Sequence, residues 1–69
     1  MQELRDIGTT IRRLRLRAGH TQEVFAERCG LNRSHMGLIE RGECNVTVGT
    51  LKTIADGLGV RVRDLLKDC

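Results

Sequence analysis

The stretch from Thr21 to Gly42 constrains the fold more than any other part of the chain, because it holds helix-starting and helix-ending residues at close intervals. Thr21 and Asn32 can each cap the start of a helix, since their side-chain oxygens accept a hydrogen bond from an orphan backbone N–H. Gly30 and Gly42 can each end a helix, since glycine tolerates a positive φ. The pattern predicts two short helices joined by a tight turn.

The apolar residues of this stretch agree with helices at residues 22–29 and 33–41. Each helix has one apolar face at helical spacing, and that face is expected to turn inward. The inward residues are Phe25, Ala26 and Cys29 on the first helix and Met36 and Ile39 on the second. Two helices in this relation form a helix-turn-helix, in which the second helix offers its outer face to a partner.

Apolar periodicity predicts three further helices, at residues 3–18, 48–58 and 62–67, although Arg61 is a poor cap for the last one. Gly8 either weakens the first helix by about 1 kcal/mol relative to alanine or marks a close helix contact. The stripes of the first two are Leu4, Ile7, Ile11 and Leu14, and Leu51, Ile54, Ala55 and Leu58. The prediction is an all-α, compact five-helix domain with the helix-turn-helix at its centre.

Composition narrows the class of protein further. The chain has 69 residues and one aromatic side chain, which predicts a single domain over residues 1–69 with an aliphatic core. It has no proline and no apolar run of membrane-spanning length, and we expect no signal peptide because the N-terminus lacks an apolar h-region. Its three cysteines lack the spacing of a disulfide framework or a zinc site, so we expect no metal, no cofactor and a reducing cytoplasm. The net charge of +3 does not by itself identify nucleic acid as the partner.

These helices and motifs resemble the phage repressor and Cro-type helix-turn-helix family, also called xenobiotic-response-element-like, which has a lambda-repressor-like fold. The resemblance covers nearly the whole chain, through IRRLRLRAGHTQEVFAERCGLNRSHMGLIERG, NVTVGTLKTIADGLGV and DLL. Within the family, LNRSHMGLIERGECNVTVGTL looks like the controller proteins of restriction–modification systems. The resemblance implies a homodimer that places a recognition helix, residues 33–41, in the DNA major groove.

Carried over residue by residue, the resemblance implies three groups of functional residues. The base contacts would be Arg33, Ser34, His35 and Leu38. The DNA backbone contacts would be Thr21, Gln22, Asn32, Arg41 and Asn45. A structural ion pair would join Arg15 and Glu40. His20 stands where the family usually has Leu or Met, and we expect it to pack over the junction of the first two helices rather than to bind a metal.

Chemistry that does not depend on the resemblance supports part of this assignment. Arg33 begins the second helix of the motif, where its guanidinium fork can pair with guanine O6 and N7 for ~1–3 kcal/mol of discrimination. Ser34 and His35 can each contact phosphate or base, and His35 equally fits a capping or solvent role. Leu38 is expected to face outward, where it meets a thymine methyl or else lies at the edge of the core.

Arginines of the first helix have two possible roles. Arg12, Arg13 and Arg17 either extend a DNA-binding surface or are solvated, and we favour solvation because their helix carries the core stripe. For Arg15 we favour burial with Glu40 over a DNA contact. Removing one partner of such a buried pair costs ~3–5 kcal/mol, because the other charge is left stranded.

The C-terminal segment has more apolar side chains than a short last helix can bury alone. They are Leu58, Val60, Val62, Leu65 and Leu66. They either form the surface of a homodimer, which we favour, or close the core of the monomer. A homodimer would place its two recognition helices one DNA turn apart, ~34 Å, and so implies a palindromic operator.

The leading hypothesis is a sequence-specific, DNA-binding transcription regulator in the cytoplasm, which binds double-stranded DNA and has RNA polymerase as a further candidate partner. A restriction–modification controller protein is its sharper form. The alternative is an antitoxin-like module that binds DNA weakly and a protein tightly. An enzyme is disfavoured because the sequence has no nucleophile–base set, phosphate loop or metal spacing. Single-stranded RNA binding is disfavoured because stacking aromatics are lacking.

Overall fold

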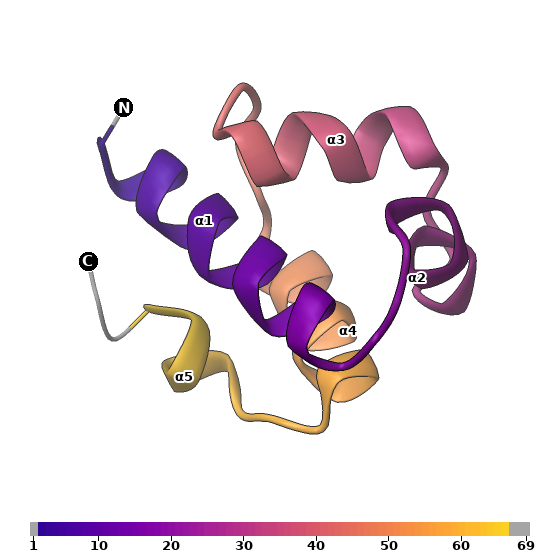
Figure 1. Ribbon diagram of the computed structural model, residues 1–69. Coiled ribbons are helices and arrows are strands. Elements are labelled where there is room, and N and C mark those ends of the chain that lie inside the picture. Colours follow the sequence, from indigo (N-terminus) through magenta and orange to yellow (C-terminus); the bar gives the residue numbers. More distant parts are fainter. Residues whose placement is uncertain (1, 67–69) are drawn as a thin grey trace.

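A computed structural model describes residues 2–66, and this part of the chain contains five helices and no strand (Figure 1). The all-α fold class is therefore confirmed. The helices are α1 (Gln2–Arg17), α2 (Gln22–Arg28), α3 (Arg33–Arg41), α4 (Val48–Leu58) and α5 (Val62–Leu66).

Helix boundaries follow the capping residues closely. The Thr21 hydroxyl accepts a hydrogen bond from Val24 N–H at 3.1 Å, and Asn32 Oδ1 accepts one from His35 N–H at 2.7 Å. Gly42 ends α3 with φ +71°, in the left-handed region that glycine adopts readily. The predicted bounds of α3 and α4 are confirmed, whereas α1 begins and ends one residue earlier and α2 ends at Arg28, one residue earlier than predicted.

The last helix starts where the apolar pattern predicts, but its N-terminus is capped by a residue that the sequence analysis did not consider. Asp64 Oδ2 accepts a hydrogen bond from the backbone N–H of Arg61 at 3.0 Å. The carboxylate three residues into the helix thus supplies the cap that the Arg61 side chain lacks. The predicted end of this helix at Lys67, like Cys69, lies outside the described residues.

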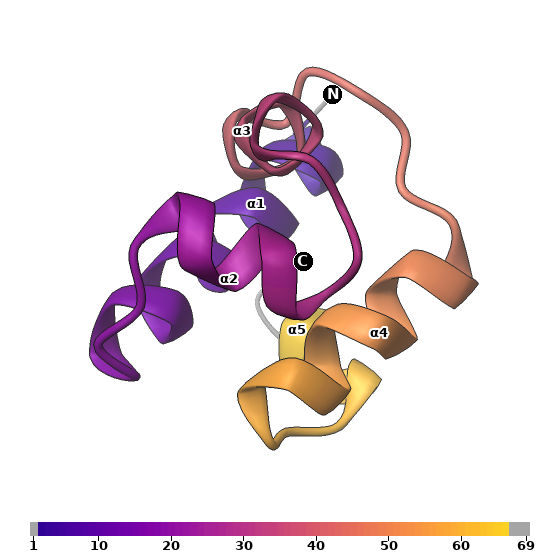
Figure 2. The same ribbon diagram turned by 90° about the vertical axis from the view of Figure 1, so that its right-hand side faces the viewer.

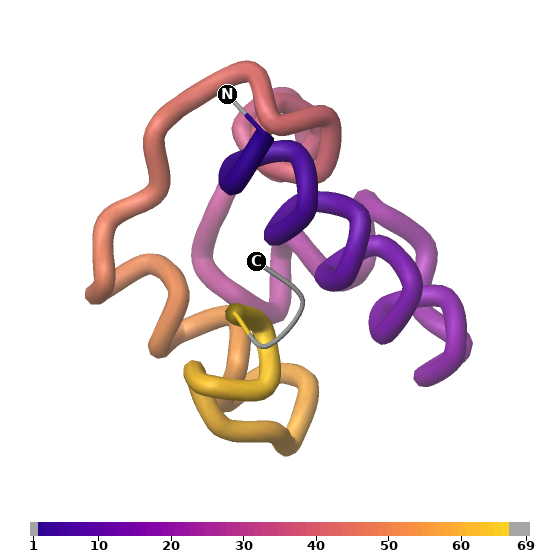
Figure 3. The backbone as a smooth tube through the Cα atoms, turned by 90° about the vertical axis from the view of Figure 1, so that its left-hand side faces the viewer, coloured from indigo at the N-terminus to yellow at the C-terminus, as the bar shows by residue number. Residues whose placement is uncertain are grey.

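One hydrophobic core joins the helices. The α1 helix lies between α3 on one side and α5 on the other (Figure 3), and the loop after α3 runs along the outside of the molecule to α4 (Figure 2). Of the predicted α1 stripe, Ile7 and Ile11 are buried, whereas Leu4 and Leu14 are half-buried. The largest fully buried side chains are Phe25, Ile11, Met36, Ile39, Ile54 and Leu65.

The close-contact role of Gly8 is the correct alternative. A Cβ added to Gly8 would lie 2.4 Å from the carbonyl oxygens of both Ile39 and Glu40. Real Cβ atoms do not approach backbone oxygens this closely, so α1 and α3 can cross here only without a side chain. Gly8 therefore sets the distance between α3 and the rest of the core.

The C-terminal apolar residues divide into two sets. Leu65 has no exposed surface, so it closes the core of the monomer and does not itself face outward. Leu66 is 39% exposed, on the other side of the same short helix. Leu58, Val60 and Val62 are half-buried and pack against the core. The part of this segment that is available to a partner is thus smaller than the sequence predicts.

Two cysteines lie within the described residues. Cys29 is buried, as predicted, and burial raises the pKa of its thiol, while Cys44 in the loop after α3 is half-buried. Over residues 2–66, no helix is long and apolar enough to cross a membrane, and no three His, Cys, Asp or Glu side chains gather as metal ligands would.

Replacing Gly8 with alanine is expected to lower the free energy of unfolding by about 1–3 kcal/mol, because the added methyl forces α1 and α3 apart. Gly49→Ala is the matched control, since an added Cβ there meets nothing closer than 3.8 Å. Alanine at Gly49 is expected to leave stability unchanged or to raise it by up to about 1 kcal/mol. Urea unfolding followed by circular dichroism measures both variants, and equal stability of the two would contradict the assigned role of Gly8.

Candidate nucleic-acid interface

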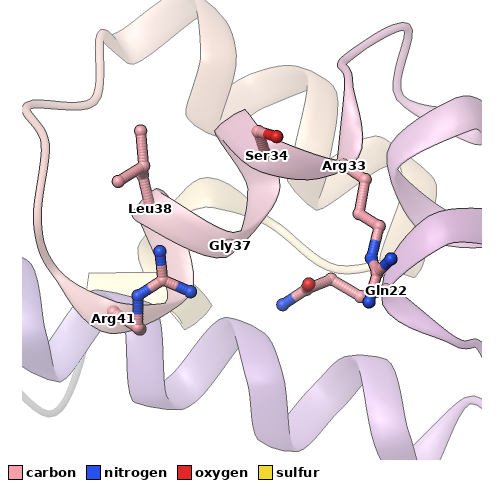
Figure 4. A pocket seen from close by; sticks show the side chains of 6 residues that line it. All are labelled: Gln22, Arg33, Ser34, Gly37, Leu38 and Arg41. Carbon is pink, nitrogen blue, oxygen red and sulfur yellow. The ribbon is translucent and has the colours of Figure 1, made fainter.

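The outward face of α3 forms one wall of an open groove of about 380 Å³ (Figure 4). Arg33, Gly37 and Arg41 follow one another at four-residue intervals, so they share one stripe of the helix. Gln22, the first residue of α2, forms the opposite wall. The residues that line the groove are Gln22, Arg33, Ser34, Gly37, Leu38 and Arg41. Several residues that were predicted individually to contact DNA thus line the same groove.

The N-terminal turn of α3 presents polar side chains to solvent. Arg33 and Ser34 are exposed and line the groove, whereas His35 is half-buried and does not line it. Asn32 is exposed, and its Oδ1 is engaged in capping the helix. Leu38 is 37% exposed and lines the groove, so it faces outward as expected, with an exposure that also fits the edge of the core.

Gln22 has a partner within the protein. Its Nε2 donates a hydrogen bond to Glu40 Oε1 at 3.1 Å, which holds the half-buried side chain between α2 and α3. A primary amide nitrogen carries two N–H groups, so a second donor is present for a ligand. Gln22 therefore connects the groove to the interior of the domain.

The expected ion pair between Arg15 and Glu40 is present and buried. Arg15 Nε and Nη2 donate to the two carboxylate oxygens of Glu40 at 2.7 and 2.9 Å, in the bidentate geometry that matches a guanidinium to a carboxylate. The exposed fractions of the two side chains are 7% and 2%. Hydrogen bonding to Glu40 raises the pKa of Arg15 despite the opposing effect of burial, so the guanidinium stays charged at every ordinary pH. Arg15 thus has the buried, structural position predicted for it in preference to a DNA contact.

The link between α1 and α2 is fixed by the same arginine. Arg15 Nη1 donates to the backbone carbonyl of His20 at 2.9 Å. The His20 ring stacks on Phe25, with ring centroids 5.8 Å apart and an interplanar angle of 21°. The packing role predicted for His20 is therefore confirmed, and its side chain closes the junction where the family usually has an aliphatic residue.

Of the remaining predicted contact residues, one lines the groove and the others lie outside it. Arg41 lines it, and its Nε donates to Glu43 Oε1 at 2.8 Å. Thr21 and Asn45 are exposed but do not line this groove, and Thr21 is engaged as the cap of α2. The α1 residues Arg12, Arg13 and Arg17 are exposed and do not line it either.

Two groove features were missed by sequence reasoning. They are the position of Gly37 beneath the Arg41 side chain and the pairing of Glu43 with Arg41. The available signal was spacing: Gly37 lies four residues from both Arg33 and Arg41 on one helical stripe. Glu43 follows Arg41 by two residues across the helix end, a separation from which no regular pairing rule predicts a contact.

Comparison with known proteins finds the same architecture. Residues 6–68 match a family described as a helix-turn-helix domain. Control protein C.BamHI from Bacillus amyloliquefaciens is 38% identical over 60 residues, which are 86% of this chain and 74% of that protein. The HTH-type transcriptional regulator SutR from Escherichia coli (strain K12) is 41% identical over 56 residues, which are 81% of this chain but only 32% of SutR.

A solved structure agrees over nearly the full length. The crystal structure of the restriction-modification controller protein C.AhdI from Aeromonas hydrophila superimposes with a TM-score of 0.91 at 35% sequence identity. The matched region covers 94% of this chain and 98% of that chain.

Replacing Glu40 with alanine is expected to lower the free energy of unfolding by ~3–5 kcal/mol, because the buried Arg15 guanidinium loses its counter-charge. Asp56→Ala is the control, because it breaks the Lys52–Asp56 pair, whose side chains are 67% and 64% exposed. That loss is expected to stay below about 1 kcal/mol. Urea titrations give both values, and similar losses in the two variants would contradict the importance assigned to the buried pair.

Proposed function

This chain belongs to the helix-turn-helix domain family and is a DNA-binding transcription regulator, and from that premise we propose that it binds a palindromic operator as a homodimer with α3 in the major groove. The observation that carries the proposal is the groove along α3, where two arginines, a glutamine, a serine and a leucine gather on one solvent-facing side. An α-helix fits the major groove, and these side chains match the donors and apolar groups that contact base edges there.

Each residue has a proposed role. The proposed base contacts are Arg33, Ser34, His35 and Leu38, with Arg33 pairing to guanine and Leu38 touching a thymine methyl. The proposed backbone contacts are Thr21, Gln22, Asn32, Arg41 and Asn45. Capping occupies one oxygen of Thr21 and of Asn32, and the hydroxyl hydrogen and the amide N–H groups can still donate to phosphate. Phosphate contacts of this kind supply much of the affinity and make it fall with salt.

Dimerisation is proposed through the C-terminal apolar segment. Leu66 is the most exposed of its large apolar side chains, and Leu58, Val60 and Val62 adjoin it half-buried. In such a dimer the two copies of α3 would need to lie about 34 Å apart, in register with successive major grooves on one side of the duplex.

The proposed biological role is that of a restriction–modification controller protein acting in the cytoplasm. Its support is the similarity to C.BamHI and C.AhdI, the latter over 98% of its chain. Occupancy of a promoter would repress transcription by exclusion of RNA polymerase or activate it by contact with the enzyme, according to where the operator lies.

Selection of random duplex DNA by the purified protein is expected to recover an inverted repeat bound by two subunits. The two-subunit complex is measured by gel filtration with light scattering on the selected duplex. Recovery of no preferred sequence, with only weak and salt-sensitive binding, would contradict the proposal and favour the antitoxin-like alternative. The next experiment would then be a search for a protein partner.

Replacing Arg33 with alanine is expected to relax specificity as well as affinity, with ~1–3 kcal/mol of discrimination lost at one base pair of each half-site. Lys52→Ala is the charge-matched control, because Lys52 is exposed on α4 and does not line the groove. Fluorescence anisotropy on the selected site and on its single base-pair variants measures the discrimination. Unchanged discrimination in Arg33→Ala would remove Arg33 from the base-contacting role.

A further inference from the structure

The side chain of Arg41 lies over the middle of α3 rather than at its end. Helical side chains lean toward the N-terminus, so the head group of Arg41 covers the turn before its own Cα. Gly37 occupies that turn, and a Cβ added there would lie 3.0 Å from Arg41 Nη1 and 3.7 Å from Nη2. The guanidinium of Arg41 therefore fills the space that a side chain at position 37 would take.

Glu43 holds Arg41 by one nitrogen only. The bond from Arg41 Nε to Glu43 Oε1 is 2.8 Å long, and the two side chains are 58% and 54% exposed. Within the described part of the chain, no acceptor is bonded to Nη1 or Nη2. The edge formed by these two nitrogens is thus oriented but unoccupied, and its parallel donors fit two adjacent acceptors such as guanine O6 and N7.

The unoccupied edge lies beside Gly37, in the groove that Arg41 lines. Gln22 Oε1 lies 3.6 Å from the same Cβ position on Gly37, so Gln22 and Arg41 approach that position from opposite sides (Figure 4). Gln22 is itself fixed by Glu40 and cannot simply swing away without breaking that bond. The Arg41 head group therefore lies beside Gly37 at the middle of α3, in the groove that faces the bases in the proposed complex.

We propose that Arg41 is a second guanine-contacting residue, positioned by Glu43 and admitted to the groove by Gly37. The inference rests on the proposed major-groove binding of α3, and it moves Arg41 from the backbone contacts to the base contacts. Each half-site then contains two arginine-contacted guanines, one for Arg33 at the start of α3 and one for Arg41 nearer its middle.

The carboxylate of Glu43 distinguishes a base contact from a phosphate contact. At a phosphate, the half-exposed Glu43 beside Arg41 would face a negative charge and weaken binding. A guanine edge carries two neutral acceptors, so the carboxylate can stay in place and keep the arginine oriented. Charge and geometry together favour the guanine.

The test uses the selected operator and a set of duplexes in which each G·C pair of the half-site is changed singly to A·T. Wild-type protein is expected to lose roughly 5- to 150-fold in affinity at the pair that Arg41 contacts. In Arg41→Lys the positive charge remains but the fork is lost, so discrimination at that one pair is expected to fall to near onefold. Discrimination at the pair contacted by Arg33 is expected to remain.

Variants of the two positioning residues complete the test. Gly37→Ala is expected to lose the same discrimination as Arg41→Lys, because the added methyl displaces the guanidinium, while alanine is readily accommodated in a helix. Glu43→Gln is expected to reduce discrimination at that pair and to raise affinity for unrelated DNA. Circular dichroism and urea unfolding establish that each variant is folded at the assay temperature.

Several outcomes would overturn the inference. If Arg41→Ala weakens binding to every duplex by one factor and reduces the salt slope by about 0.9, Arg41 contacts a phosphate. If Gly37→Ala keeps full discrimination at the pair assigned to Arg41, neither Gly37 nor the position of Arg41 beside it contributes to base recognition. Failure of the proposed function looks different, because wild-type protein would then prefer no site at all, and both proposals would fall together.

Discussion

The buried ion pair between Arg15 and Glu40 is the interaction on which the rest of the structure depends. The pair joins α1 to α3 directly. Arg15 also donates to the His20 carbonyl, which holds the link to α2. Glu40 Oε1 accepts a further hydrogen bond from Gln22, which orients that side chain. Two charges taken out of water are stabilised only when their geometry and hydrogen bonds are complete. The first three helices are therefore fixed relative to one another by a polar network as well as by the apolar core.

That network also connects stability to recognition. Glu40 lies on the inner side of α3, and through Gln22 it contacts a side chain that lines the outer groove. The close crossing at Gly8 brings α1 against the carbonyls of Ile39 and Glu40 on the same helix. The α3 helix is thus held at two adjacent points on its inner side, one at Glu40 and one at the crossing with Gly8.

Sequence reasoning succeeded where the physical signal was local. Caps such as Thr21 and Asn32 act within one turn, so α2 and α3 begin where the residue types predict. The resemblance, rather than spacing, identified the pair of Arg15 and Glu40. Burial of Leu65 agrees with the less favoured alternative, closure of the monomer core, because the apolar pattern of a five-residue helix does not show which face is buried. The position of the Arg41 side chain depends on the space left by Gly37 and on Glu43, which lies beyond the end of α3. Helical periodicity predicts neither contact.

The nine residues of α3 lie between two independent boundaries, the Asn32 cap and the left-handed Gly42. Between them, Met36, Ile39 and Glu40 serve the fold, while Arg33, Ser34 and Leu38 face the groove. Because of this separation, substitution of the outward residues of α3 leaves unchanged the buried residues that hold the helix in place. The glycine beneath Arg41 is the exception, since a larger residue there would displace the Arg41 guanidinium and with it the proposed guanine contact.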